Sequence, residues 1–161
     1  MPDSEQRSDS IHSRLAGLLQ QPEEQIRLAE AALLIAASEY PNLDAPQYVR
    51  RLDAMAGAIG KRVGSETDPF QIIAQINQFL FQEEGFFGNT KDYYDPRNSF
   101  LSDVLDRKTG IPITLATVYL EIAERTGRLT HRSKPGRRIG LERPVNAPCA
   151  PGSLVLFEIA E

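Results

Sequence analysis

The sequence is poor in the residues that carry most nucleophilic and metal chemistry. Its 161 residues include one cysteine, two histidines and no tryptophan. With Cys149 as the one cysteine, no disulfide can form within the chain, and a single thiol suits a reducing compartment. The polar start of the sequence lacks the apolar segment of a signal peptide, and no run approaches the roughly 20 apolar residues of a membrane span. We therefore expect a cytoplasmic chain without a membrane segment.

Metal and cofactor motifs are missing as well. His12 and His131 lie far apart, and neither has a second histidine or a cysteine at metal-ligand spacing. The spacing of Gly85 and Gly88 fits neither the phosphate-binding loop nor the dinucleotide fingerprint. The sequence therefore predicts no metal site and no cofactor.

The charge balance gives no general reason to expect nucleic acid as a partner. Lys and Arg total 18 against 22 Asp and Glu, for a net charge of −4. Six of the basic residues are concentrated in residues 128–143, which contain no aromatic residue. A nucleic-acid-associated regulator remains an alternative that depends on this stretch, and a solvated tail is the favoured interpretation.

Most of the chain up to residue 127 has the periodicity of helices. Residues 1–9 are polar and are expected to be disordered, and residues 10–20 form a short helix candidate. Pro22 is expected to begin a helix to about residue 38. A third helix is predicted over residues 45–63, and a fourth begins at Asp68-Pro69, where an N-cap aspartate precedes a proline.

The helical pattern breaks near residue 85 and resumes at residue 98. Gly85 and Gly88 are expected to adopt unusual φ values. Asn98 with Ser99 is predicted to cap a short helix that ends near Arg107, with Gly110 as the residue that stops it. Pro112 then begins a sixth helix to Thr126, and Gly127 closes it. After Gly127 the periodicity is lost until Ser153–Ile159, a strand candidate without an evident partner.

The stretch GFFGNTKDYYDPRNSF, residues 85–100, resembles the approach to an active site. Asp95 is expected to accept backbone N–H bonds in a turn, with Arg97 bracing the loop. The aromatic residues Phe86, Phe87, Tyr93 and Tyr94 have two interpretations. They pack beneath the loop as a satellite core, or they line a groove for a peptide or small ligand.

The predicted helix at Pro112 would direct free backbone N–H groups toward such a site. A thiol enzyme needs a cysteine there, but the sequence Gly110–Thr114 contains none. Thr114 offers a hydroxyl, and a capping or core role is the favoured interpretation. Asp103 and Asp106 share a helix face, where a solvated or capping role is favoured over acid/base catalysis. We therefore predict no catalytic residue.

Two longer stretches carry a resemblance to a known family. Residues 33–56, with LLIAASEYPNLD and YVRRLDAMA, and residues 76–127 resemble the bacterial transglutaminase-like family named for the SirB invasion-gene regulator. The resemblance implies a fold related to the transglutaminase and papain-like superfamily. Active members of that superfamily carry a Cys at the start of a central helix and a His on a later strand. That helix start corresponds to Gly110–Thr114, and the SirB-type family generally lacks the Cys too.

The resemblance ends after Gly127. The family continues with a Gly-Pro-Gly-His-Phe-type strand motif and then with tetratricopeptide-like helices, whereas this chain continues RLTHRSKP. We hypothesise a truncation or reading-frame shift after residue 127. The expected organisation is a disordered segment 1–9, a transglutaminase-like helical domain 10–127, and a poorly ordered tail 128–161.

The expected fold class is mainly α, the helical part of a transglutaminase-like α+β domain with little or no sheet. The leading hypothesis is a non-catalytic regulatory or scaffolding domain that binds an unknown protein partner. An amide- or thioester-directed hydrolase or transferase is the first alternative, and a nucleic-acid-associated transcriptional regulator is the second. The predicted groove residues are Phe86, Asn89, Tyr93, Tyr94, Asp95, Arg97, Asn98, Pro112 and Thr114.

Overall fold

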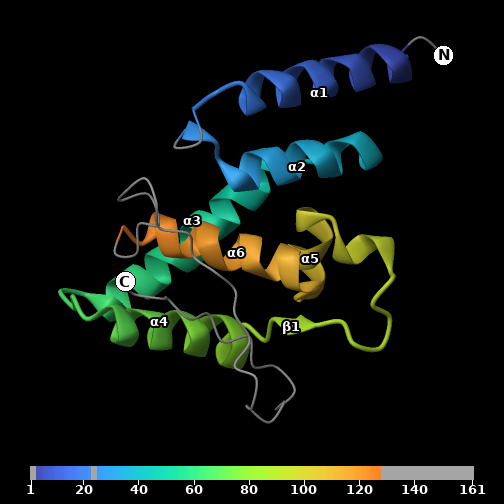
Figure 1. Cartoon of the computed structure of the whole chain (residues 1–161). Helices are drawn as coiled ribbons and strands as arrows, with labels where there is room; N and C mark the ends of the chain where they lie inside the picture. Colours follow the sequence, from blue (N-terminus) through green and yellow to red (C-terminus); the bar gives the residue numbers. More distant parts are fainter. Residues whose placement is uncertain (1–2, 23–24, 128–161) are drawn as a thin grey trace.

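The computed structural model describes residues 3–22 and 25–127. The basic tail, the strand candidate at residues 153–159, His131 and Cys149 lie outside the described residues. Within the described part, helices dominate the fold (Figure 1). In chain order the elements are α1 (Asp3–Leu19), α2 (Leu28–Glu39), α3 (Ala45–Val63), α4 (Pro69–Asn77), the π-helix η2 (Gln78–Glu83), β1 (Phe87–Gly88), the 3-10 turn η3 (Pro96–Asn98), α5 (Leu101–Arg107), β2 (Thr109–Gly110) and α6 (Pro112–Arg125).

The mainly α fold class is confirmed, and a very small sheet accompanies it. β1 and β2 pair in parallel, with Phe87 opposite Thr109 and Gly88 opposite Gly110. Two 2.9 Å hydrogen bonds hold the pair, from Phe87 N to the Lys108 carbonyl and from Asn89 N to the Gly110 carbonyl. The crossover between the strands contains the loop after Gly88, η3 and α5. The strand pairing therefore holds together the two ends of this crossover, which includes the candidate site described below.

One hydrophobic core runs between the helices. α6 packs along α3, and α2 contacts α3, α5 and α6. α1 lies beside α2 at the edge of the fold away from α4 (Figure 1). The fully buried aliphatic side chains of this core are Leu33, Leu52, Ile59, Ile72, Ile76, Leu80, Leu101, Val104, Leu105, Val118 and Ile122.

Helix starts with local capping chemistry form where the sequence predicts them. The Asp44 carboxylate accepts a 3.2 Å bond from Gln47 N at the start of α3. The Asp68 carboxylate accepts a 3.0 Å bond from Phe70 N at the start of α4. Each aspartate satisfies a backbone donor that the first helical turn leaves unpaired.

Two predicted helix starts were wrong. The first helix begins at Asp3, seven residues before the predicted start. Glu, Gln and Arg have high intrinsic helix propensity, so a polar segment can continue a helix. The second helix begins at Leu28 and not at Pro22. A side chain from α6, described below, caps its first turn, so the sequence around residue 28 gives no signal for this start.

Three local assignments near the site also need correction. Gly110 does not stop α5, because Lys108 takes the left-handed conformation there with φ 56° and Gly110 lies in β2. Gly88 lies in β1 without a positive φ, whereas Gly85 has φ 74° as expected. Asn98 belongs to η3, and α5 begins with Phe100 as its N-cap and no side-chain cap.

Lys108 is held in its unusual conformation by contacts with the chain before β1. Its ammonium pairs with the Glu84 carboxylate and lies 5.0 Å from the centre of the Phe86 ring. These contacts offset the cost of a left-handed conformation in a residue with a Cβ.

Among the residues described, we find no helix with both the length and the hydrophobicity that a bilayer crossing requires.

Candidate functional site

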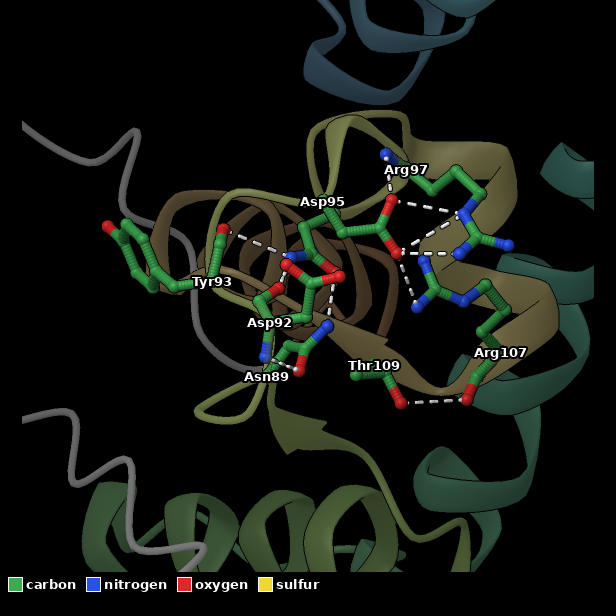
Figure 2. A network of polar contacts seen from close by, with 8 residues as sticks. Asn89, Asp92, Tyr93, Asp95, Arg97, Arg107 and Thr109 are labelled. Atoms are coloured by element: carbon green, nitrogen blue, oxygen red, sulfur yellow. Dashed lines mark hydrogen bonds and ion pairs between the residues drawn. The ribbon is translucent and has the colours of Figure 1, made fainter.

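The candidate site is the crossover loop that follows β1, together with the start of α6. A buried polar network holds this loop (Figure 2). Asn98 is its centre and is fully buried. Its amide group donates to the carbonyls of Asp92, at 2.8 Å, and Tyr93, at 3.1 Å. Its amide oxygen accepts a 3.1 Å bond from Asn89, whose own oxygen accepts from Asp92 N at 3.0 Å.

This network explains why the loop has one defined path. The loop has no regular secondary structure between Asn89 and Asp95, so its backbone groups need side-chain partners or water. Asn98 supplies partners for two consecutive carbonyls, and Asn89 supplies one for a backbone N–H. The sequence pattern predicts Asn98 as a helix cap, but its side chain points back into the loop.

Asp95 forms a second part of the network. Its side chain is 6% exposed. The carboxylate accepts bonds of 3.0 Å from Arg97 N and Arg97 Nε and of 2.9 Å from Arg97 Nη2. Arg107 Nη2 lies 3.1 Å from the same carboxylate, so Asp95 faces both arginines (Figure 2). The hydrogen bond from the Arg97 side chain, with the Arg107 charge nearby, holds the pKa of Asp95 below its usual value. The predicted turn and the brace by Arg97 are confirmed, and Arg107 is a member that the sequence analysis missed.

Thr114 ties the start of α6 to this loop. Its hydroxyl donates to the Asn98 carbonyl at 2.7 Å and accepts a 3.2 Å bond from Ile111 N. A nucleophilic hydroxyl needs a base that removes its proton, and a main-chain carbonyl cannot do so. The capping interpretation of Thr114 is therefore confirmed, with Pro112 as the first residue of α6.

Close packing surrounds the Thr114 hydroxyl. A Cβ added at Gly110 would lie 2.7 Å from Thr114 Oγ1 and 2.9 Å from a Val104 methyl carbon. Gly110 thus allows β2, α5 and α6 to approach one another at the site. Glycine is needed at position 110 because there is no space for a Cβ, and not because of its backbone conformation, since its φ is not positive.

The aromatic residues of the stretch divide into two groups. Phe86 is 2% exposed and belongs to the core. Phe87, Tyr93 and Tyr94 are exposed by 51%, 53% and 90%, so they do not form a satellite core beneath the loop. Tyr93 and Tyr94 contact each other edge to face, with ring centres 5.4 Å apart. Ile113, in the first turn of α6, is also exposed.

The other candidate groups have structural partners. The Asp106 carboxylate accepts a 2.8 Å bond from the Tyr48 hydroxyl and pairs with Arg51. The pKa of Tyr48 is raised to about 12, mainly by burial and next by the hydrogen bond to Asp106. In the described part of the chain, no three His, Cys, Asp or Glu side chains gather as a metal site would require.

A cleft of about 400 Å³ lies beside this pair. None of the nine predicted groove residues lines it, since its walls come from the α2–α3 connection, α3 and α5. The groove at residues 85–98 stays a prediction. What the loop geometry offers is a set of exposed aromatic side chains on a backbone fixed by buried hydrogen bonds.

Known proteins share parts of this sequence. A family described as "Transglutaminase-like superfamily" matches residues 46–130. A UPF0162 protein of Xylella fastidiosa is 40% identical over 109 residues, which are 65% of this chain and 37% of that protein. A UPF0162 protein of Pseudomonas aeruginosa is 33% identical over 101 residues, 61% of this chain and 36% of that protein.

A eukaryotic protein shares a shorter segment. F-box only protein 21 of Mus musculus is 40% identical over 57 residues, 35% of this chain and 9% of that protein.

The chain spans little more than a third of the length of the two bacterial relatives described above. No solved structure matches it.

Proposed function

The chain belongs to the transglutaminase-like superfamily, and on this premise we propose that it is a non-catalytic module that binds a protein partner. The binding surface is the loop after β1 with the first turn of α6. Its central residues are Tyr93, Tyr94 and Ile113.

The chemistry at the start of α6 supports a non-catalytic role. Ile111, Pro112 and Ile113 stand where active members of the superfamily, by resemblance, carry a cysteine. The hydroxyl of Thr114 bonds to backbone groups of Ile111 and Asn98. Substrate turnover here would need a nucleophile and a base that these residues do not supply.

The loop geometry supports binding, and one observation carries the proposal. Tyr94 is 90% exposed, yet its loop is held by the buried Asn98. Tyrosine is enriched among the residues that dominate binding energy at protein interfaces. A loop whose backbone is already ordered loses less conformational entropy on binding. An exposed aromatic pair on a fixed loop is therefore suited to anchor a partner.

We also propose the finer family assignment and the domain boundary. The stretch from Gly85 to Thr114 supports a SirB-type member, a family associated with tetratricopeptide-like helices. A cytoplasmic regulatory role follows from that assignment. The superfamily match ends at residue 130, which supports a boundary near Gly127. The DNA sequence around codon 127 tests the hypothesis of a reading-frame shift after residue 127. If none of the other frames downstream of that codon encodes a Gly-His-Phe-containing continuation, the hypothesis fails.

The binding proposal is tested by quantitative capture from extracts of the native host. The full chain is immobilised as wild type, Tyr93→Ala, Tyr94→Ala and Phe70→Ala. Phe70 is the matched control, because it is an exposed aromatic residue, at 72%, in the first turn of α4. We expect specific proteins whose recovery falls in both tyrosine variants and not in Phe70→Ala. Equal recovery by all four proteins contradicts the proposal.

A turnover assay tests the non-catalytic part separately. The chain is incubated with a glutamine-donor peptide and a primary amine, and ammonia release is measured. We expect no turnover above the buffer blank. Turnover that Thr114→Val abolishes would show that Thr114 acts in catalysis and would favour the enzyme alternative.

A further inference from the structure

The cleft beside α5 has features of a binding site that is separate from the loop. Its volume, about 400 Å³, is within the range of small-ligand pockets. Its walls come from the α2–α3 connection, the start of α3, and α5. The lining residues are Tyr40, Pro41, Asn42, Leu43, Tyr48, Ser102, Asp103 and Asp106.

Two buried polar atoms of this wall lack hydrogen-bond partners. Ser102 is 3% exposed, and its hydroxyl has no partner among the residues that the structure describes. The same holds for Oδ2 of Asp103, the next residue along α5. Buried polar atoms are nearly always paired, and an unpaired one costs free energy through lost hydration. The Asp103 oxygen only accepts hydrogen bonds, and the Ser102 hydroxyl can accept as well as donate, so a group with N–H or O–H donors would satisfy both.

The charges near these two atoms indicate whether the donor group should be charged or neutral. Asp106 is balanced by Arg51, whereas Asp103 has no ion pair within 4.0 Å in residues 3–22 and 25–127. The hydrogen bond between the Tyr40 hydroxyl and Asp103 raises the pKa of Tyr40 above its ordinary value. The cleft therefore combines tyrosine rings with a carboxylate that has no direct ion pair and feels the Arg97 charge from farther away.

We propose that this cleft binds a guanidinium group. The planar guanidinium has several N–H donors in a fixed fork and pairs with carboxylates. Its charge would supply the direct ion pair that Asp103 lacks, and its several donors could serve acceptors on more than one residue. It also stacks on aromatic faces, which Tyr40 and Tyr48 provide. The guanidinium comes either from a small molecule or from an arginine side chain of a partner protein.

The test uses the full chain and two guanidinium probes. N-butylguanidinium stands for a small ligand, and a blocked Gly-Arg-Gly peptide stands for a side chain. N-butylurea is the neutral control of the same shape. Binding is followed by ¹H–¹⁵N chemical shifts and by calorimetry. We expect saturable binding of N-butylguanidinium with shifts in residues 40–48 and 102–106, and no saturable binding of N-butylurea. Binding of the peptide as well assigns the site to a side chain, and its failure to bind assigns it to a small molecule.

Matched variants separate the site from general charge. Asp103→Asn and Glu30→Gln each remove one negative charge, and Glu30 lies in the first turn of α2. We expect Asp103→Asn to weaken binding about tenfold or more, and Glu30→Gln to leave it unchanged. Ser102→Ala gives a second reading, with a smaller loss, should Asp103→Asn fail to fold. Equal affinity of Asp103→Asn, Ser102→Ala and wild type overturns the proposal, as does absence of binding or equal binding of the neutral urea.

Discussion

Glu121 Oε1 accepts a 2.8 Å hydrogen bond from Ala29 N, a contact between residues 92 positions apart. Ala29 is fully buried and Glu121 is 2% exposed. The second carboxylate oxygen of Glu121 pairs with Arg125, whose Nε also bonds to Asp53 Oδ1 at 2.8 Å. A buried acid in α6 therefore caps α2 and links it to α3. This contact sets where α2 begins.

Loss of this carboxylate should destabilise the fold strongly. Glu121→Ala leaves the Ala29 N–H unpaired in the core and Arg125 without its buried partner, so we expect a loss of about 3 kcal/mol in the free energy of unfolding. Glu121→Gln keeps an acceptor for Ala29 and should lose less. Urea denaturation of the three proteins measures both values. Stability of Glu121→Ala within about 0.5 kcal/mol of wild type, the usual range for surface changes, would show that the cap is dispensable.

Gly110 should tolerate no side chain. Its added Cβ meets Thr114 Oγ1 at 2.7 Å, so Gly110→Ala forces either α6 or Val104 to move, at about 1–3 kcal/mol. Gly57→Ala is the control, because Gly57 lies within α3 with nothing within 4 Å of an added Cβ. We expect it to stabilise the protein by roughly 0.5–1 kcal/mol. Thermal unfolding measures both, and equal effects of the two substitutions would refute the packing argument.

Asp95 should make stability depend on acid pH. Its folded pKa is lowered by Arg97, below the unfolded value of about 3.9. Its contribution is therefore present at pH values above the unfolded pKa and is lost as pH falls through the lower folded pKa. We expect Asp95→Asn to be less stable than wild type at pH 7, with a difference that shrinks below about pH 4. Urea midpoints at several pH values measure this, with the exposed Asp92→Asn as control. A difference that is constant with pH would assign the effect to shape and not to charge.

Asn98 should control the order of the candidate binding loop. Asn98→Ala removes the donors to the carbonyls of Asp92 and Tyr93 and should cost about 1–3 kcal/mol. The effect should concentrate in the loop, as faster amide exchange at Asp92, whose N–H bonds to Asn89. Native-state hydrogen exchange measures it. Uniform acceleration across α3 and α6 would instead indicate general destabilisation.

The sequence allowed prediction of those elements whose signals are local. Asp44, Asp68 with Pro69, and Pro112 each mark a helix start within a few residues, and these three starts are confirmed. The predicted start of α2 was wrong because the side chain that caps this helix, Glu121, comes from α6. A glutamate three residues after the buried Val118, on the apolar stripe of α6, was the signal available for it.

The sequence indicated several residues of the candidate site, but it indicated the contacts of only some of them. Asp95 and Arg97 form the turn that their spacing indicates, because both interact within one turn of chain. Asn98 and Lys108 did not follow local rules, because Asn98 bonds into the preceding loop and Lys108 is held by Glu84. A two-residue parallel pair such as β1–β2 is too short for an alternating pattern to indicate.

Photo-crosslinking from the loop tests the central claim, partner binding through the exposed tyrosines, most directly. The chain carries benzoylphenylalanine in place of Tyr94 in one protein and in place of Phe70 in another, and both are irradiated in cells of the native host. We expect a discrete crosslinked product from position 94 that position 70 does not give. Absence of a product from position 94, or the same products from both positions, would contradict it.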